Sequence, residues 1–131
     1  MYTATEKFNK KYTEVVKTIE KNFVDLKAGE KMLISSPRTI ANYVAKIPYG
    51  TEKSMKLMRR ELAENANADN TCPLTCGIFL RIAIDASIEQ SNGAKPDLPF
   101  WRVIDRKSSL INKLPISEKY LTKLRTSEGL Q

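Results

Sequence analysis

The chain of 131 residues contains no histidine and only two cysteines, and these shortages disfavour several kinds of chemistry. Histidine has an unperturbed pKa suited to proton transfer near neutral pH, so its absence removes every Ser-His or Cys-His nucleophile pair and every histidine-ligated metal. A structural zinc site needs four ligands, usually Cys or His, and Cys72 and Cys76 supply only two. We therefore expect no metal and no cofactor.

Long apolar runs are also missing. No stretch approaches the roughly 20 apolar residues of a membrane span, and no apolar leader follows Met1. The sequence therefore predicts a cytoplasmic protein with no membrane partner. In that reducing compartment, Cys72 and Cys76 are expected to be free thiols.

Charge is abundant and unevenly placed. The net charge is +7, with +3 in residues 1–40 and +4 in residues 101–131, around a nearly neutral apolar middle. A hydrophobic content of 41% and a charged content of 28% are typical of a globular protein, and the length predicts a single domain over residues 1–131. The basic balance favours a polyanionic partner, and double-stranded DNA is the expected one.

Helical periodicity covers the first half of the chain. Apolar residues recur every three or four positions from Thr3 to about Lys27, which predicts one amphipathic helix in an N-terminal extension, residues 1–30. Ser36 and Pro37 favour the start of a short helix that ends before Pro48. Thr51 is the expected cap of a third helix, whose buried stripe is Met55, Met58 and Leu62.

The second half contains the most apolar segment. A helix is predicted from Pro73 to about Gln90, apolar nearly all round, with Arg81, Asp85 and Glu89 as a polar stripe expected to face solvent. After an irregular loop over 91–99, residues 101–104 and 109–112 predict two strands of a hairpin with a basic tip. A last helix is expected from Ser117, within a C-terminal helix and tail over 115–131. The predicted fold is mainly α: a winged helix-turn-helix core over 31–114, with one short β-hairpin and an N-terminal helix.

Two segments carry a family resemblance: Ile47-Pro48-Tyr49-Gly50-Thr51 before a helix, and Leu98-Pro99-Phe100-Trp101-Arg102-Val103-Ile104 after the apolar helix. In order and spacing, residues 37–114 resemble the DNA-binding domain of the alkylguanine-DNA alkyltransferases and their alkyltransferase-like relatives. The resemblance implies a helix-turn-helix that enters the minor groove, a pocket for a flipped alkylated guanine, and a wing formed by the basic hairpin.

The residues that perform the family's chemistry are replaced. Phe100 stands where the family has its alkyl-acceptor cysteine, and Trp101 stands where it has the activating histidine. Met55 takes the place of the family's tyrosine after Ser54, and Leu74 lies near the position of the arginine that fills the gap left by the flipped base. Alkyltransferase-like proteins also lack the cysteine and still bind lesions, so the resemblance implies binding without alkyl transfer.

The sequence thus predicts a non-catalytic DNA-binding protein that senses alkylated or distorted duplex. The expected contacts to phosphate or groove are Lys53, Ser54, Lys56, Thr71, Thr75, Arg106 and Lys107, and the residues expected to line a base pocket are Tyr49, Phe100, Trp101 and Arg102.

Two alternatives stay open. One is a protein-interaction module on the same scaffold, favoured if the segment from Thr71 to Cys76 is apolar and buried against a partner. The other is a thiol-dependent enzyme using Cys72 or Cys76, which needs an exposed cysteine of low pKa; the start of a helix favours such a pKa, whereas two small buried side chains do not.

Overall fold

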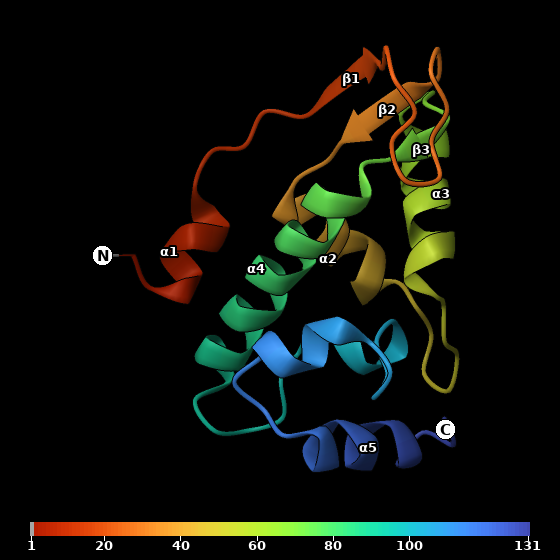
Figure 1. Ribbon diagram of the computed structural model, residues 1–131. Helices are drawn as coiled ribbons and strands as arrows, with labels where there is room; N and C mark the ends of the chain where they lie inside the picture. Colours follow the sequence, from red (N-terminus) through yellow and green to blue (C-terminus); the bar gives the residue numbers. More distant parts are fainter. Residues whose placement is uncertain (1) are drawn as a thin grey trace.

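Helix α4 (Pro73–Ser91) crosses the middle of the molecule in a computed structural model that describes residues 2–131. Figure 1 shows α1 (Ala4–Asn9) on one side of α4 and α3 (Met55–Asn65) on the other, and α2 (Pro37–Ala45) packs against α4 and also contacts α1. Helix α5 (Glu118–Thr126) lies below the end of α4, and two 3₁₀ turns, η1 (Phe100–Arg102) and η2 (Ser109–Lys113), fill the space between them. The domain is mainly helical, as predicted.

The central position of α4 follows from its composition. Its buried residues are Cys76, Leu80, Ala83, Ile84 and Ala86, and the helix begins at Pro73 and ends one residue beyond the predicted Gln90. The main core joins α4 to side chains from α2, α3, η1, η2 and α5, among them Ile40, Met58, Phe100, Ile111 and Leu121. Among residues 2–131, no helix combines the length and apolar character needed to cross a membrane.

Local capping sets the other helices. Ser36 caps α2 with Pro37 in the first turn, as predicted, and Ser117, from which the last helix is expected, caps α5. The cap of α3 is Ser54, whose side chain accepts a hydrogen bond from the Leu57 N–H, and not Thr51. Between α2 and α3, residues 47–53 form a turn that contains no helix.

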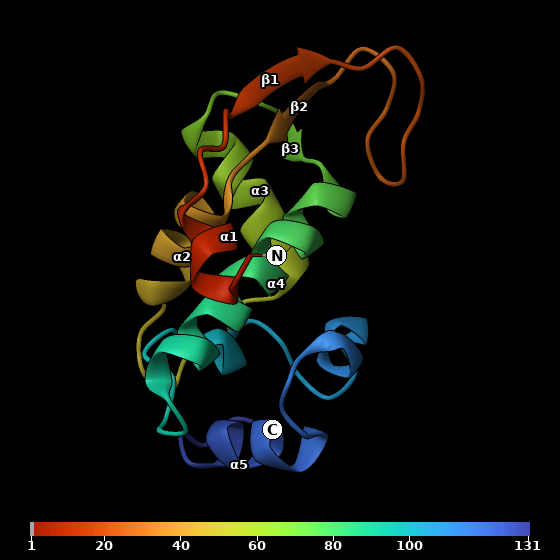
Figure 2. The ribbon, with the colours of Figure 1, turned by 90° about the vertical axis from the view of Figure 1, so that its left-hand side faces the viewer.

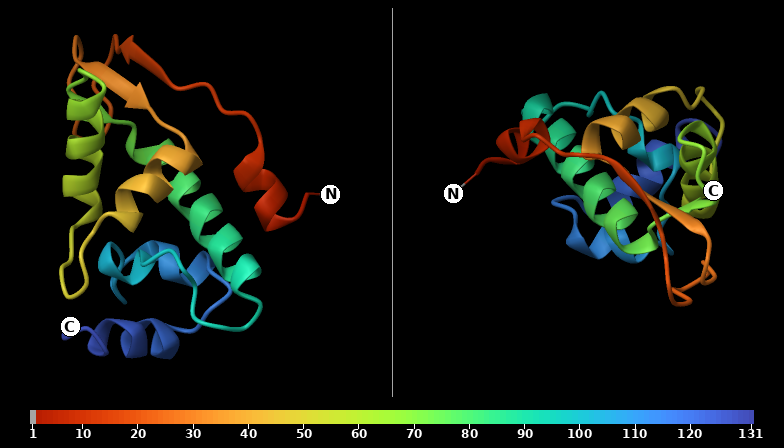
Figure 3. Two further views of the ribbon diagram at one scale, coloured as in Figure 1. Left: turned by 180° about the vertical axis from the view of Figure 1, so that it is seen from behind. Right: turned by 90° about the horizontal axis from the view of Figure 1, so that it is seen from above.

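A small sheet covers one end of the helices. Strand β1 (Val15–Thr18) pairs antiparallel with β2 (Lys31–Ile34), and β2 pairs parallel with β3 (Asn70–Thr71) just before α4. Val16 lies opposite Leu33, and Leu33 lies beside Thr71. The views from behind and from above in Figure 3 show this sheet at the end of the domain that also contains the start of α4.

The predicted N-terminal helix over residues 3–27 is wrong. Only Ala4–Asn9 is helical; β1 follows, and residues 19–30 form a long loop that projects from the sheet in Figure 2. The apolar spacing fits a helix, but Val15, Val16, Thr18 and Ile19 are β-branched, and such residues favour extended backbone. Hydrogen bonding to β2 then stabilises residues 15–18 as a strand.

The predicted hairpin over residues 101–112 is also wrong. Its two halves form the 3₁₀ turns η1 and η2, and the antiparallel hairpin of this domain is instead β1–β2. Successive side chains of a strand point to opposite faces, whereas Phe100 and Trp101 both enter the core, and a 3₁₀ turn allows this. The wing implied by the family resemblance therefore has no β-structure here.

Candidate nucleic-acid interface

A buried carboxylate organises the residues that were predicted to form a base pocket. The side chain of Glu128 is 0% exposed, and it accepts hydrogen bonds from Trp101 Nε1 at 2.8 Å, from Arg102 Nε and Nη2 at 2.8 Å each, and from the Gly50 N–H at 2.9 Å. The hydrogen bond from Arg102 is the main reason that the pKa of Glu128 falls to about 2. The carboxylate thus holds the turn at Gly50 against η1.

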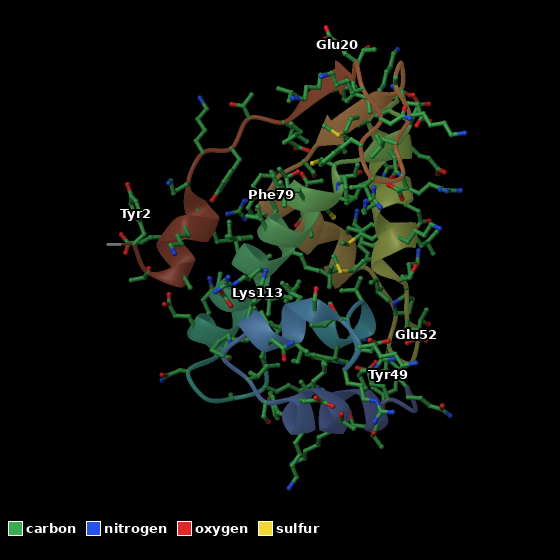
Figure 4. The ribbon with its side chains drawn as sticks, in the orientation of Figure 1. Tyr2, Glu20, Tyr49, Glu52, Phe79 and Lys113 are labelled. Atoms are coloured by element: carbon green, nitrogen blue, oxygen red, sulfur yellow. The ribbon has the colours of Figure 1, made fainter. Side chains whose placement is uncertain are left out.

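Arg125 of α5 fixes the same region from the other side. Its Nη1 donates to the carbonyl oxygen of Trp101 at 2.7 Å and to that of Ile104 at 3.2 Å, and its Nη2 pairs with Glu52. Figure 4 shows Glu52 and Tyr49 beside the C-terminal end of α5 and away from Lys113. These contacts are structural, because each satisfies a backbone or side-chain group of the chain itself.

The predicted base pocket is not formed by its four residues. Phe100 and Trp101 are 0% and 2% exposed in the core, whereas Tyr49 is 68% exposed and donates its hydroxyl hydrogen bond to the Ser127 carbonyl. Arg102 is committed to Glu128 and to the carbonyl of Ile47. A shallow surface groove touches Trp101 and Arg102, but neither Phe100 nor Tyr49 lines it. Phe100 is thus a core-packing residue and not the wall of an open pocket.

A larger cleft lies elsewhere, along α4. It has a volume of about 640 Å³ and is bounded by α1, by the start of α3, by the exposed side of α4 and by residues 108–113. Its apolar wall includes Met55, Leu74, Ile78 and Leu110, and its charged side chains are Lys7, Arg81, Asp85 and Lys113. An apolar wall with a few charged groups is typical of a ligand-binding cleft.

Positive charge dominates this cleft. Arg81 Nε lies 3.6 Å from Asp85 Oδ2, while Lys7 and Lys113 form no salt bridge with any residue in the described part of the chain. Burial raises the pKa of Asp85, and the second oxygen of its carboxylate, Oδ1, is buried without a hydrogen-bond partner. Lys7 also lies close enough to Asp85 to favour the ionised form of that carboxyl and lower its pKa, so three cations share one carboxylate in this cleft.

The three residues predicted to contact DNA near the start of α3 differ in what their side chains already bind. Lys53 Nζ pairs with Glu61 Oε1 at 3.0 Å and is half-buried, and Ser54 is occupied as the cap of α3. Lys56 is exposed and directly follows Met55, a lining residue of the cleft. Lys56 forms no salt bridge among the described residues, although it lies near enough to Asp25 to help lower the pKa of that carboxyl.

At the start of α4, the prediction for Thr71 is wrong. Thr71 is 0% exposed, its hydroxyl donates to the Arg59 carbonyl at 2.6 Å, and its own carbonyl accepts from Arg59 Nε. The Thr75 hydroxyl is buried without a hydrogen-bond partner. The side chains that this part of α4 exposes are Leu74, at 63%, and Ile78, at 48%.

Arg106 and Lys107 are exposed, as contact with a phosphate requires. They lie in the turn between η1 and η2, where the Lys107 N–H donates to Asp105 Oδ1 at 2.9 Å. Ser108 and Ser109, the next two residues, line the cleft. The basic tip is thus a tight turn beside the cleft.

Lys7, Arg81 and Lys113 were not among the predicted site residues. Arg81 belongs to a stripe that the helical spacing favours as solvent-facing, and Lys7 lies in a segment predicted as one long helix. Lys113 has no motif around it. Only the packing of α1 and η2 against α4 brings the three into one cleft.

Both cysteines are buried, which leaves the thiol-enzyme alternative without an exposed nucleophile. Burial raises the pKa of the Cys76 thiol to about 12. Thr71, Cys72 and Cys76 are also buried against this chain itself, and in the same segment Leu74 is an apolar side chain that remains exposed.

We expect both thiols to resist modification in the folded protein. A thiolate is the reactive form, so Cys76 should react with Ellman's reagent on the order of a thousandfold more slowly at neutral pH than an unperturbed thiol. Absorbance should report almost no reaction until denaturant is added, after which both of the cysteines react. Rapid labelling of one cysteine without denaturant would contradict the burial described here.

Comparisons with protein-family models, with curated proteins and with solved structures found no match to this chain.

Proposed function

We propose that the protein binds double-stranded DNA without catalysing a reaction, through the face that contains the cleft along α4. The observation that carries this proposal is the excess of positive charge in that cleft, where Lys7, Arg81 and Lys113 share the lining with one carboxylate, Asp85. Lys56, Arg106 and Lys107 are exposed and lie within two residues of a lining residue in the sequence. A row of cations around an apolar wall suits a partner with phosphates outside and bases inside.

The apolar part of the face favours DNA with weakened stacking. Proteins that bind the minor groove often insert Leu or Ile side chains between base steps, and Leu74 and Ile78 are the apolar side chains that α4 exposes. Unstacking costs less at a damaged or mismatched step. We therefore propose that the protein prefers alkylated or distorted duplex, on a scaffold of the alkyltransferase-like winged-helix type in which the turn at 105–108 takes the place of the wing.

A salt titration tests the proposal. Fluorescence anisotropy of a short labelled duplex should show affinity that falls steeply with salt, because binding releases counterions from the phosphates. Substitution of Lys107 with alanine should weaken binding to all duplexes alike and should lower the slope of log K against log salt by about 1. Lys123→Ala on α5 removes the same charge outside the cleft lining and should leave the slope unchanged.

Two results would reject parts of the proposal. Binding that is undetectable even at low salt would reject DNA as the partner. Equal affinity for a plain duplex and for one containing alkylguanine or a mismatch would reject lesion sensing and leave general DNA binding in place.

A further inference from the structure

Helix α1 cannot hold its position through its own stability. It has six residues, none of them buried, and isolated helices shorter than about 12 residues are marginal in water. Its first turn is closed by a capping box, in which Thr3 and Glu6 each satisfy a backbone N–H of the other. Contacts with the rest of the domain must therefore decide where α1 lies.

The main anchor of α1 is the carboxylate of Glu89 in the last turns of α4. Its two oxygens accept hydrogen bonds from the Ala4 N–H at 3.2 Å and from the Thr5 N–H at 2.9 Å. These are N–H groups of the first turn, which have no partner within a helix, and a negative charge there is favourable. The pKa of Glu89 is lowered by the hydrogen bonds from Thr5 and Ala4.

Two weaker contacts hold the far end of α1. The Arg38 guanidinium lies 4.7 Å from the centre of the Phe8 ring and donates to Asn9 Oδ1 at 2.8 Å. Tyr12, just beyond the helix, packs edge-on against Phe79 of α4 with ring centres 5.4 Å apart. Figure 4 shows Phe79 on the side of α4 that faces the N-terminal segment.

This arrangement explains the polar stripe of α4. Arg81, Asp85 and Glu89 follow each other at intervals of four, so they lie along one face of the helix. Against the expectation of a solvent-facing stripe, this face receives α1: Glu89 binds its start, and Ala4 and Lys7 share a cleft with Arg81 and Asp85.

We propose that Glu89 is a positioning residue for nucleic-acid binding: by holding α1 against α4, it places Lys7 in the cleft, where Lys7, Arg81 and Lys113 together bind one backbone phosphate of the DNA. The proposal rests on the proposed function. The three cations come from three separate elements and share one carboxylate, Asp85, which pairs with Arg81 and also interacts with Lys7. A phosphate supplies the negative charge that this single carboxylate leaves uncompensated.

The proposal predicts that Glu89→Ala weakens DNA binding, which is the opposite of what the change in net charge alone predicts. Glu89→Ala raises the net charge, so general electrostatics predicts tighter DNA binding. Loss of the Lys7 contact predicts the reverse: weaker binding and a slope of log K against log salt reduced by about 0.9. Glu64→Ala is the matched control, because Glu64 is exposed near the end of α3 and its side chain forms no hydrogen bond or salt bridge among the described residues.

A double-mutant cycle separates positioning from a general loss of structure. Lys7→Ala should reduce the slope by the same amount as Glu89→Ala, and the double variant should behave like either single variant, since both act on one contact. Backbone NMR of the free protein gives a second readout: the amides of residues 4–9 should lose their helical shifts in Glu89→Ala and keep them in Lys7→Ala.

The experiment is anisotropy of a short labelled duplex across a range of salt, with the full chain and these four variants. If Glu89→Ala binds as tightly as Glu64→Ala and shows an unchanged slope, the positioning role of Glu89 is overturned. Salt-dependent binding by the wild-type chain would still support the proposed function in that case. Independent, additive effects of Lys7→Ala and Glu89→Ala also overturn the positioning role. Absence of binding by the wild-type chain overturns both.

Discussion

Replacing Glu128 with alanine should lower the free energy of unfolding by about 3 to 5 kcal/mol, the range measured when one partner of a buried ion pair is removed. The substitution leaves the Arg102 guanidinium buried without its carboxylate, and it also leaves Trp101 Nε1 and the Gly50 N–H without an acceptor. Urea denaturation followed by the fluorescence of Trp101 measures the change.

Glu118→Ala is a suitable control because Glu118 is exposed in the first turn of α5, where it contributes only a favourable interaction with the helix dipole. Its substitution should cost about 0.3 to 1 kcal/mol. A Glu128→Ala variant as stable as Glu118→Ala would show that the network around Glu128 contributes little.

The same carboxylate makes stability depend on pH in a defined direction. The pKa of Glu128 is about 2 in the folded protein and near 4.5 in the unfolded chain, so the folded state favours the ionised form. The stabilisation is present in full above about pH 4.5, and it is lost as the pH falls toward 2. Glu128→Ala should therefore flatten the acid limb of the stability profile measured by thermal unfolding.

Phe100→Ala should have an effect of similar size, about 3 to 5 kcal/mol, because it removes a large side chain from a closed core. Phe100 is fully buried, and its ring lies edge-on to Trp101 with centres 5.4 Å apart. Leu74→Ala is the control: most of the Leu74 side chain is in solvent, so its loss should cost well under about 1 kcal/mol. Both are measured by urea denaturation.

A small loss for Phe100→Ala would mean that the space around this position is open, as a reactive pocket requires. A large loss supports the structural conclusion that Phe100 serves as a packing site. The two outcomes differ by several kcal/mol, so the measurement discriminates between them.

Local signals predicted α2, α4 and α5 well. Ser36 with Pro37, Pro73 before a long apolar run, and Ser117 before an amphipathic stretch are features of the chain itself, and each marks a helix start in the structure. The errors lie where partners distant in sequence decide. Val15 and Val16 become a strand because β2 pairs with them, and Trp101 turns inward because Glu128 accepts its N–H.

The candidate site follows the same division. Lys56, Arg106 and Lys107 could be predicted because their exposure depends on short local segments. Thr71 could not, since it is buried where β3 pairs with β2, and its hydroxyl bonds to Arg59, twelve residues earlier in the chain. The cleft itself could not be predicted, because its walls come from α1, α4 and η2, which the sequence alone does not bring together.

The network around Glu128 also has a topological meaning. Gly50 precedes Glu128 by 78 residues and Arg102 precedes it by 26, so one carboxylate closes two long loops of the chain at a single point. A disulfide closes loops in the same way and gains by restricting the unfolded chain, but Cys72 and Cys76 are both free. Glu128 is the non-covalent counterpart of such a cross-link: it can be opened by a proton, where a disulfide is opened by a reductant.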